Sequence, residues 1–478
     1  MKTLKVLFFG LACAGLMAAC NESPVLTDDL TNTTMKIASG DCIPVFIVEP
    51  VEGDDTPNLQ NAFNEAAEEE NGAIVQLVEG NYDIGFIEVR EFNGSFIGAG
   101  KGKTVITARP GLNCDLLISQ KVFTYILKFI GGDVFVSDMT LRAPTGGICS
   151  TGSGKISGLL EFSDYQLDYN PGYIKATVNN VEFIGQPLSG NFSISKGIRA
   201  GCDSNGPTNL TFSNIDLTVT NCSFNTIEYA VQFTGIHKGN LVLGKQSNGN
   251  KFTGCQYSNH IYNNINVSLS VTGNSYYNIK NGYGININNV KDSKFKIEIQ
   301  DHITICSIER NYFNTVEGYY AMYIQDTRRS LGEPYPMLVL VKNNNFVVGG
   351  GAYGIDCWYL EGAVIRNNQF RGSSTTAGVR IGGYIVNKVK IYNENGLLLG
   401  NNFSNFTPST PTSYSVILNV PTRNWSIVGG DVGESIRNLG ENNLITGMNI
   451  DTSELPLGQT ITDNLEEMRE GMKDEGDF

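Results

Sequence analysis

A short motif that ends in an aromatic residue recurs along the chain from about residue 180 onward. Each copy runs from an aliphatic or β-branched stretch into asparagine and, within three residues, into phenylalanine or tyrosine. The copies end at Phe224, Phe252, Tyr276, Phe313, Phe346, Phe370 and Phe403, which lie 24 to 37 residues apart. A unit of that length holds two or three short strands with turns, and a series of such units predicts a solenoid whose coils stack strand on strand.

A second motif follows the first, mostly about nine residues later, and has a small residue before a run of period two. Its copies start at Ala230, Gly284, Ala321, Gly354 and Gly378. Period two is typical of strands with one buried face. Leucine-rich repeats and β-propellers would need regular leucine spacing or a four-strand blade motif, and neither is present. Asparagine ahead of the aromatic residue tolerates a left-handed corner and can form an amide ladder between coils.

One amphipathic helix is expected ahead of the solenoid. Pro57 suits a first helical turn, and Gly72 ends the pattern. Its apolar stripe consists of Leu59, Ala62, Phe63, Ala66 and Ala67. A single helix in this place predicts a cap over the core of the first coil.

The segment after this helix start carries a resemblance to a known superfamily. The matching residues are Asp55, Thr56, Leu59, Ala62, Phe63, Gly80, Asn81, Tyr82, Gly98, Ala99, Gly100, Lys103, Thr104 and Ile106. With the later coils, residues 54–450 resemble pectin-lyase-like proteins, and the resemblance implies an all-β, right-handed parallel β-helix (solenoid). That superfamily includes lyases, hydrolases, epimerases, tailspikes and adhesins, so the resemblance implies no single activity.

The amino terminus reads as an export signal. A basic start with Lys2 and Lys5 precedes an apolar run, residues 6–19, that is too short to span a bilayer. The residues before Cys20 resemble the lipobox of bacterial lipoproteins, although Met17 stands where that family mostly has leucine. We expect residues 1–19 to be removed, Cys20 to be acylated, and the protein to be anchored by lipid in the outer membrane, on its periplasmic or cell-surface side. An ordinary secretory signal is the alternative.

Charge is concentrated at the two ends of the chain. Of the net charge of −14, residues 20–71 carry −11 and residues 451–478 carry −7, whereas residues 72–450 hold 29 basic and 27 acidic residues. A nearly neutral body offers no basic face for phosphates, which argues against nucleic-acid binding. Ile97 occupies the position where a phosphate-binding loop ending at Thr104 needs glycine, which argues against a nucleotide site.

The second motif also predicts which side chains face outward. One outward column would be Gln232, Asn286, Tyr323, Asp356 and Arg380, and a neighbouring column would be Thr234, Asn288, Gln325, Trp358 and Gly382. Amides, an acid, a base and aromatic rings side by side suit a groove that binds polysaccharide. The charged segment between Gln325 and Pro336 can wall such a groove or be an ordinary turn. An ordinary mixed polar surface is the alternative for the columns.

Two kinds of polysaccharide chemistry could use these side chains. A lyase needs a base and a cation, calcium being one option, and Arg380 with Asp356 and Asp326 could serve. A glycoside hydrolase needs two carboxylates, which Asp326 and Asp356 could supply. The motifs that mark polygalacturonases and calcium-dependent pectate lyases are mostly missing. A non-catalytic surface adhesin or glycan-binding scaffold is therefore kept as the alternative.

Further expectations concern the remaining segments. Residues 20–53 should form a polar tether and lead-in, and residues 451–478 an acidic segment whose part 463–474 forms a short helix that caps the last coil. A mobile acidic tail is the alternative. Cys222 and Cys357 have the surroundings of buried small hydrophobic residues. No cysteine and histidine spacing suggests a structural zinc site.

Overall fold

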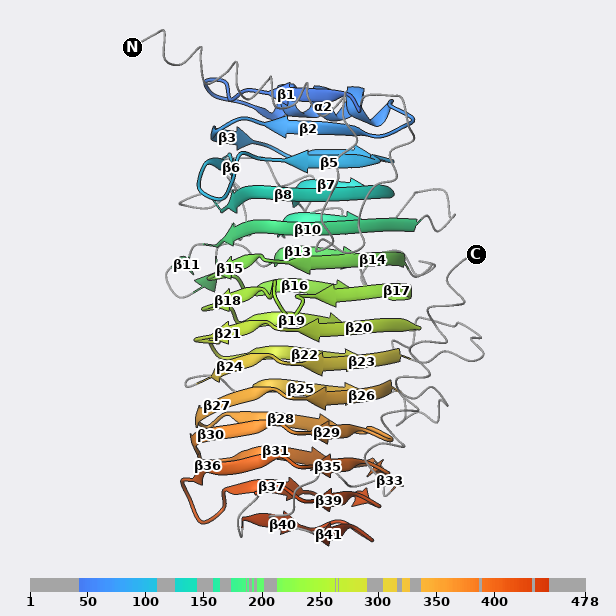
Figure 1. Ribbon diagram of the computed structural model, residues 1–478, viewed down its shortest axis with the longest axis vertical. Coiled ribbons are helices and arrows are strands. Elements are labelled where there is room, and N and C mark those ends of the chain that lie inside the picture. Colours follow the sequence, from blue (N-terminus) through green and yellow to red (C-terminus); the bar gives the residue numbers. More distant parts are fainter. Residues whose placement is uncertain are drawn as a thin grey trace.

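Parallel strands stacked in register make up most of this molecule. The computed structural model describes residues 43–109, 125–143, 158–163, 173–185, 187–188, 191–192, 196–201, 213–262, 264, 266–289, 304–315, 320–326, 337–386, 389–431 and 435–446. Figure 1 shows the coils following one another along the long axis in sequence order. The prediction of a right-handed parallel β-helix is confirmed.

Each coil contributes strands to three rows. Row 1 contains β1 (Val45–Val48), β2 (Ala73–Leu77), β5 (Gly94–Ile97), β8 (Gly132–Arg142), β10 (Tyr173–Ile184), β14 (Ser213–Thr220), β17 (Ile236–Leu243), β20 (Val267–Thr272), β23 (Thr304–Glu309), β26 (Met337–Lys342), β29 (Val364–Arg366), β35 (Leu397–Leu399), β39 (Ser426–Val428) and β41 (Leu444–Thr446). Row 2 contains β3 (Gly80–Ile84), β6 (Thr104–Ala108), β15 (Ser223–Asn225), β18 (Lys251–Thr253), β21 (Ser275–Tyr277), β24 (Tyr312–Thr315), β27 (Asn345–Gly350), β30 (Gln369–Ser374) and β36 (Asn402–Pro408). The long strands β8 and β10 pair with both rows and join them into one sheet.

Row 3 forms a separate sheet of 12 strands. It contains β4 (Ile87–Arg90), β7 (Tyr125–Ile130), β9 (Gly158–Ser163), β13 (Lys196–Gly201), β16 (Tyr229–Thr234), β19 (Tyr257–Tyr262), β22 (Tyr283–Asn289), β25 (Tyr320–Asp326), β28 (Tyr353–Trp358), β31 (Ala377–Gly382), β37 (Tyr414–Leu418) and β40 (Ile436–Asn438). Three short pairs lie outside the rows: β11 (Pro187–Leu188) with β12 (Asn191–Phe192), β32 (Tyr384–Val386) with β33 (Val389–Ile391), and β34 (Asn393–Glu394) with β38 (Thr422–Arg423).

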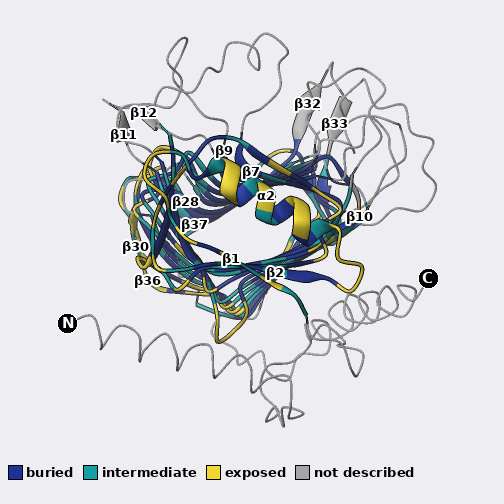
Figure 2. Ribbon diagram, turned by 90° about the horizontal axis from the view of Figure 1, so that it is seen from above, coloured by how far each residue is buried: buried dark blue, intermediate teal, exposed yellow. Residues whose placement is uncertain are grey.

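The expected amino-terminal cap is present as α2 (Thr56–Ala67). Figure 2 looks down the coils and shows α2 lying across the end of the solenoid. Phe63 is fully buried, and its ring centroid lies 5.5 Å, 5.0 Å and 5.6 Å from those of Phe92, Phe96 and Phe129. This helix therefore closes the first coil with aromatic packing. Among the described residues, no helix is long and apolar enough to cross a membrane.

The seven aromatic residues of the first motif, preceded by Phe183, form one stack inside the solenoid. Neighbouring rings lie nearly parallel, with centroids 4.4 to 4.9 Å apart, in the order Phe183, Phe224, Phe252, Tyr276, Phe313, Phe346, Phe370 and Phe403. All eight are at most 3% exposed. The repeating aromatic residue thus occupies the same buried position in successive coils.

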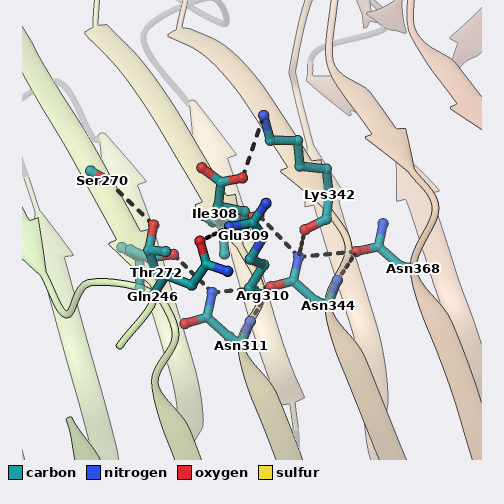
Figure 3. A network of polar contacts seen from close by, with 11 residues as sticks. Gln246, Ser270, Thr272, Ile308, Glu309, Arg310, Asn311, Lys342, Asn344 and Asn368 are labelled. Atoms are coloured by element: carbon teal, nitrogen blue, oxygen red, sulfur yellow. Dashed lines mark hydrogen bonds and ion pairs between the residues drawn. The ribbon is translucent and has the colours of Figure 1, made fainter. Parts of the chain in front are cut away.

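Asparagines two positions before these aromatic residues form the expected amide ladder. Its members are Asn250, Asn274, Asn311, Asn344, Asn368 and Asn401, all at most 2% exposed. Each side-chain oxygen from Asn274 onward accepts from both the backbone N–H and the amide of the asparagine one coil earlier, at 2.8 to 3.1 Å. Figure 3 shows the part of the ladder from Asn311 to Asn368.

The residue before a ladder asparagine usually has a left-handed backbone. Gly273, Arg310, Asn343, Asn367 and Gly400 have φ between 53° and 71°. The left-handed corner and the amide ladder, both expected of the asparagine ahead of the aromatic residue, therefore belong to two neighbouring residues.

The four cysteines among the described residues are Cys222, Cys255, Cys306 and Cys357, all buried and unpaired. The prediction for Cys222 and Cys357 is confirmed. Cys20, the segment 327–336 and the expected helix 463–474 lie outside the described residues. Strand β1 pairs with β2, so the sheet starts within the segment expected as a lead-in.

Candidate functional site

The outer face of row 3 brings together the two columns expected from the sequence. In the central column Gln232, Asn286, Tyr323, Asp356 and Arg380 lie at matching positions on successive strands. The neighbouring column contains Thr234, Tyr262, Asn288, Gln325, Trp358 and Gly382 in the same register. The period-two pattern thus assigned these positions to their columns correctly.

Strand β19 adds residues that the sequence interpretation missed. His260 lies between Gln232 and Asn286 in the central column, and Tyr262 lies beside it in the second. The ring of His260 stacks on that of Tyr262 with centroids 5.7 Å apart. This strand has Ser258 where other copies of the second motif have alanine or glycine, so its sequence does not match that motif.

A third column, which the sequence interpretation also missed, consists of tyrosines. Tyr229, Tyr257, Tyr283, Tyr320 and Tyr353 begin successive strands of row 3. Their rings stack with centroids 4.7, 5.4, 4.9 and 5.2 Å apart. Each tyrosine stands directly before the small residue of the second motif, or before serine in β19, so the signal was present one position upstream.

Stacking decides what these tyrosines can present to a ligand. Because each inner ring is sandwiched between two others, the ring faces are occupied and only edges and hydroxyl groups are left to contact a partner. Burial, with Glu228 and the neighbouring Tyr257 adding to it, raises the pKa of Tyr229 to about 12. Burial likewise raises the pKa of Tyr283 to about 12. The hydroxyl groups therefore stay protonated and can donate hydrogen bonds.

His260 connects the tyrosine column to the amide column. Its ring lies edge-on to Tyr229 and Tyr257, with centroids 5.1 and 5.6 Å apart. Burial, with a contribution from the charge of Lys196, lowers the pKa of His260 to about 4. The amide nitrogen of Asn286 lies 3.3 Å from its Nδ1, and because an amide nitrogen donates, Nδ1 accepts. His260 is thus a neutral imidazole with its proton on Nε2.

Asp356 and Arg380 form a buried ion pair at the other end of the column. The carboxylate is fully buried, and its oxygens accept from Nε and Nη2 of Arg380 at 2.7 and 2.5 Å. The indole of Trp358 donates a third hydrogen bond at 2.9 Å. Burial raises the pKa of Asp356, while the hydrogen bonds and charge of Arg380 oppose that rise. The bidentate geometry is that of an ionised carboxylate held by a guanidinium group.

Arg380 has further partners beside Asp356. Nη1 donates to the hydroxyl of Tyr353 at 2.8 Å, and the guanidinium lies 3.9 Å from the ring centroid of Tyr353 and 5.1 Å from that of Trp358. Burial alone would lower the pKa of Arg380, but hydrogen bonding to Asp356 raises it. Arg380 is thus a permanently charged group engaged on several sides.

Asp326 lies apart from this pair. It is 1% exposed, at the end of β25, and pairs in register with Asn289. Because it follows Gln325 directly, it lies on the opposite side of the strand from the outward columns. On β25 the register partner of Asp356 is Tyr323, which stands three positions before Asp326. Asp326 and Asp356 are therefore offset by roughly 10 Å along the strand direction. The three expected catalytic residues thus divide into one ion pair and one separate carboxylate.

Three amide oxygens on this face are buried without a donor. They belong to Gln232, Asn286 and Asn288. A buried acceptor that has lost water and gained no donor is costly, and since these oxygens are closed to water, a ligand hydroxyl could reach them only after the amide side chains turn. The side chain of Gln325, by contrast, accepts from the hydroxyl of Tyr323.

The amino-terminal part of the same face carries a second set of buried charges. Glu161 lies 2.8 Å from Nη1 of Arg199 and 3.9 Å from Nζ of Lys128, and all three belong to the central column.

Among the described residues, no three histidine, cysteine, aspartate or glutamate side chains gather as a metal site would need.

Comparisons with known proteins add to this description. No protein-family model matches the chain, and no curated protein matches it. Solved structures do match. The A-module of a mannuronan C-5 epimerase from Azotobacter vinelandii is 16% identical with a TM-score of 0.44, over 83% of this chain and 95% of that one. PfbA, a surface adhesin of Streptococcus pneumoniae, is 14% identical with a TM-score of 0.43, over 78% and 93%. The Agl-KA catalytic domain is 15% identical with a TM-score of 0.47, over 86% and 69%. These figures concern the path of the chain and carry no argument about activity.

Proposed function

We propose that this protein binds polysaccharide on the outer face of row 3, between β16 and β28. The observation that carries the proposal is the combination of stacked tyrosine hydroxyls with an adjacent column of amide side chains in the same register. Sugars present many hydroxyl groups that both donate and accept, which is the chemistry these side chains can satisfy. Trp358, beside Gln325, adds an aromatic side chain at one end of this face.

Binding is favoured over catalysis by the state of the acidic residue. A general acid, base or nucleophile must reach its substrate, whereas Asp356 is fully buried and its two oxygens accept three hydrogen bonds. Asp326, the second carboxylate of the expected hydrolase pair, is buried on the opposite side of its strand. A glycan-binding scaffold thus needs no rearrangement of this cluster, while a lyase or hydrolase using Asp326, Asp356 and Arg380 does.

The binding proposal is tested by removing one hydroxyl from the stack. Tyr283→Phe keeps the ring and deletes the hydroxyl, and Tyr277→Phe is the matched control because Tyr277 lies on row 2, outside the proposed surface. Retardation in native gels containing polysaccharides measures affinity. One lost hydrogen bond, about 1 kcal/mol, corresponds to roughly fivefold weaker binding for Tyr283→Phe, with Tyr277→Phe unchanged. Equal retardation of both variants would contradict the proposed surface.

Catalysis is tested on the same panel of polysaccharides. Reducing ends report hydrolysis, and ultraviolet absorbance of unsaturated uronates reports elimination. Retarded migration without either product supports the scaffold. Product that disappears in Arg380→Lys but not in Tyr277→Phe would establish the enzyme instead.

We also propose that Cys20 anchors the chain in the outer membrane by its acyl groups, which the lipobox-like sequence supports. In Cys20→Ala, labelling with a fatty-acid analogue should be lost and the protein should leave the membrane fraction. A variant that still partitions with membranes would overturn the assignment.

A further inference from the structure

We infer that the polysaccharide bound on row 3 is uncharged and lies parallel to the solenoid axis. This inference rests on the proposed function and adds the class of ligand. Two independent observations carry it: the state of the cations and the pitch of the columns.

The described cations on this face from β7 to β31 are already neutralised or engaged. Arg380 is held by Asp356, and Arg199 and Lys128 share Glu161. Lys196, which is in register with Tyr229, is 7% exposed and has an interaction of its own. A carboxylated sugar needs a cation that is free to bind it. The guanidinium of Arg380 is already bidentate to the buried Asp356 and cannot leave it without exposing that carboxylate to the loss of its partner.

His260 supplies no positive charge either. Its Nδ1 accepts from Asn286, and tyrosine rings surround it, so the ring is neutral around pH 7.

The direction of the ligand follows from the register. Equivalent side chains recur once per coil, at the strand spacing of roughly 4.8 Å, and the tyrosine rings follow at 4.7 to 5.4 Å. The hydroxyl and amide groups thus form parallel rows along the axis. A linear chain lying along these rows meets the same set of partners at every coil, and a chain lying across them meets each kind only once.

The test uses polysaccharides that differ only in charge. Polygalacturonate and alginate are each compared with their carboxyl-reduced, neutral counterparts in affinity gels at low and at high salt. Retention by the reduced forms at least tenfold stronger than by the acidic parents, and unchanged by salt, is the expected result. Salt-sensitive retention by the acidic forms alone would overturn the inference while leaving the proposed function standing. No retention by any form, neutral or acidic, in this and the wider panel would overturn both.

A gain of function provides a second test. Asp356→Asn releases the guanidinium of Arg380, and the variant should acquire salt-sensitive retention by acidic polysaccharide that the parent lacks. Asp133→Asn is the matched control, because it releases Lys175 and makes the same change in net charge on row 1. Thermal unfolding confirms that both variants are folded. If the folded Asp356→Asn protein is retained by acidic polysaccharide no more strongly than the control, neutralisation of Arg380 by Asp356 is not what excludes charged ligands.

Discussion

The amide ladder offers a sharp test of what holds the coils in register. Asn344 accepts from the backbone N–H and the amide of Asn311, both at 3.0 Å. Its own amide donates to the carbonyl of Ile308 at 2.9 Å and to the side-chain oxygen of Asn368 at 3.0 Å. Figure 3 shows these contacts on both sides of Asn344. Asn344→Ala removes all of them at once.

The expected cost follows from which groups lose their last partner. The buried N–H of Asn311 loses its acceptor, which costs about 1–3 kcal/mol, and the remaining lost hydrogen bonds are worth about 1 kcal/mol each. The amide of Asn311 keeps Val271, and the oxygen of Asn368 keeps the backbone N–H of residue 344. Three such bonds are lost, so we expect the free energy of unfolding to fall by about 4–6 kcal/mol, a large part of the 5–15 kcal/mol typical of a domain.

Asn345→Ala is the matched control, one residue further along the chain. The side chain of Asn345 is only half-buried, and its oxygen has no partner, so the loss should stay within about 0.5 kcal/mol. Urea unfolding followed by circular dichroism compares the two variants. If their midpoints coincide, the ladder hydrogen bonds do not order the coils and the reasoning is wrong.

Other features give further expectations. Arg310 has a left-handed backbone with φ 56°, so Arg310→Gly should relieve strain, stabilise the protein by about 1 kcal/mol and raise its melting temperature. A lower melting temperature would show that the contacts of the arginine side chain outweigh the backbone strain. Cys306, whose pKa burial raises to about 12, should resist thiol reagents until the protein unfolds, and rapid labelling of the native protein would contradict its burial. His260 has a folded pKa near 4, below its ordinary 6.5, so the unfolded chain takes up the proton first and stability falls as pH drops from about 6.5 to about 4, by at most about 3 kcal/mol. That fall should be smaller in His260→Asn by the same amount, as measured by urea unfolding at pH 7 and pH 4.5.

Much of the fold could be predicted because its marks are local. The aromatic residue and the asparagine before it repeat with the coil, and a period of two separates inward from outward side chains. The same rule places Gln325 and Asp326 on opposite faces of their strand. How far Asp326 lies from Asp356 depends on the pairing of β25 with β28, which the structure shows.

What could not be predicted depends on register between coils. Asp356 and Arg380 are 24 residues apart, and nothing in either sequence neighbourhood says that they form a bidentate pair. The tyrosine column could have been predicted if each copy of the second motif had been extended by one residue at its start. His260 was missed because β19 has serine in place of the small apolar residue, which satisfies the same steric need by a different side chain.

From β20 to β35, the chain varies in length at one corner more than at the other two. Row 1 passes to row 2 there with the same short turn each time: Thr272 to Ser275, Glu309 to Tyr312, Lys342 to Asn345, Arg366 to Gln369 and Leu399 to Asn402. The connection from row 2 to row 3 has two to five residues, whereas the connection from row 3 back to row 1 has from five, after Trp358, to fourteen, after Asn289. Natural variation can thus insert or exchange loops there without shifting the ladder. Because that corner adjoins the column of Asn288, Gln325 and Trp358, such exchanges would change ligand preference first and stability last.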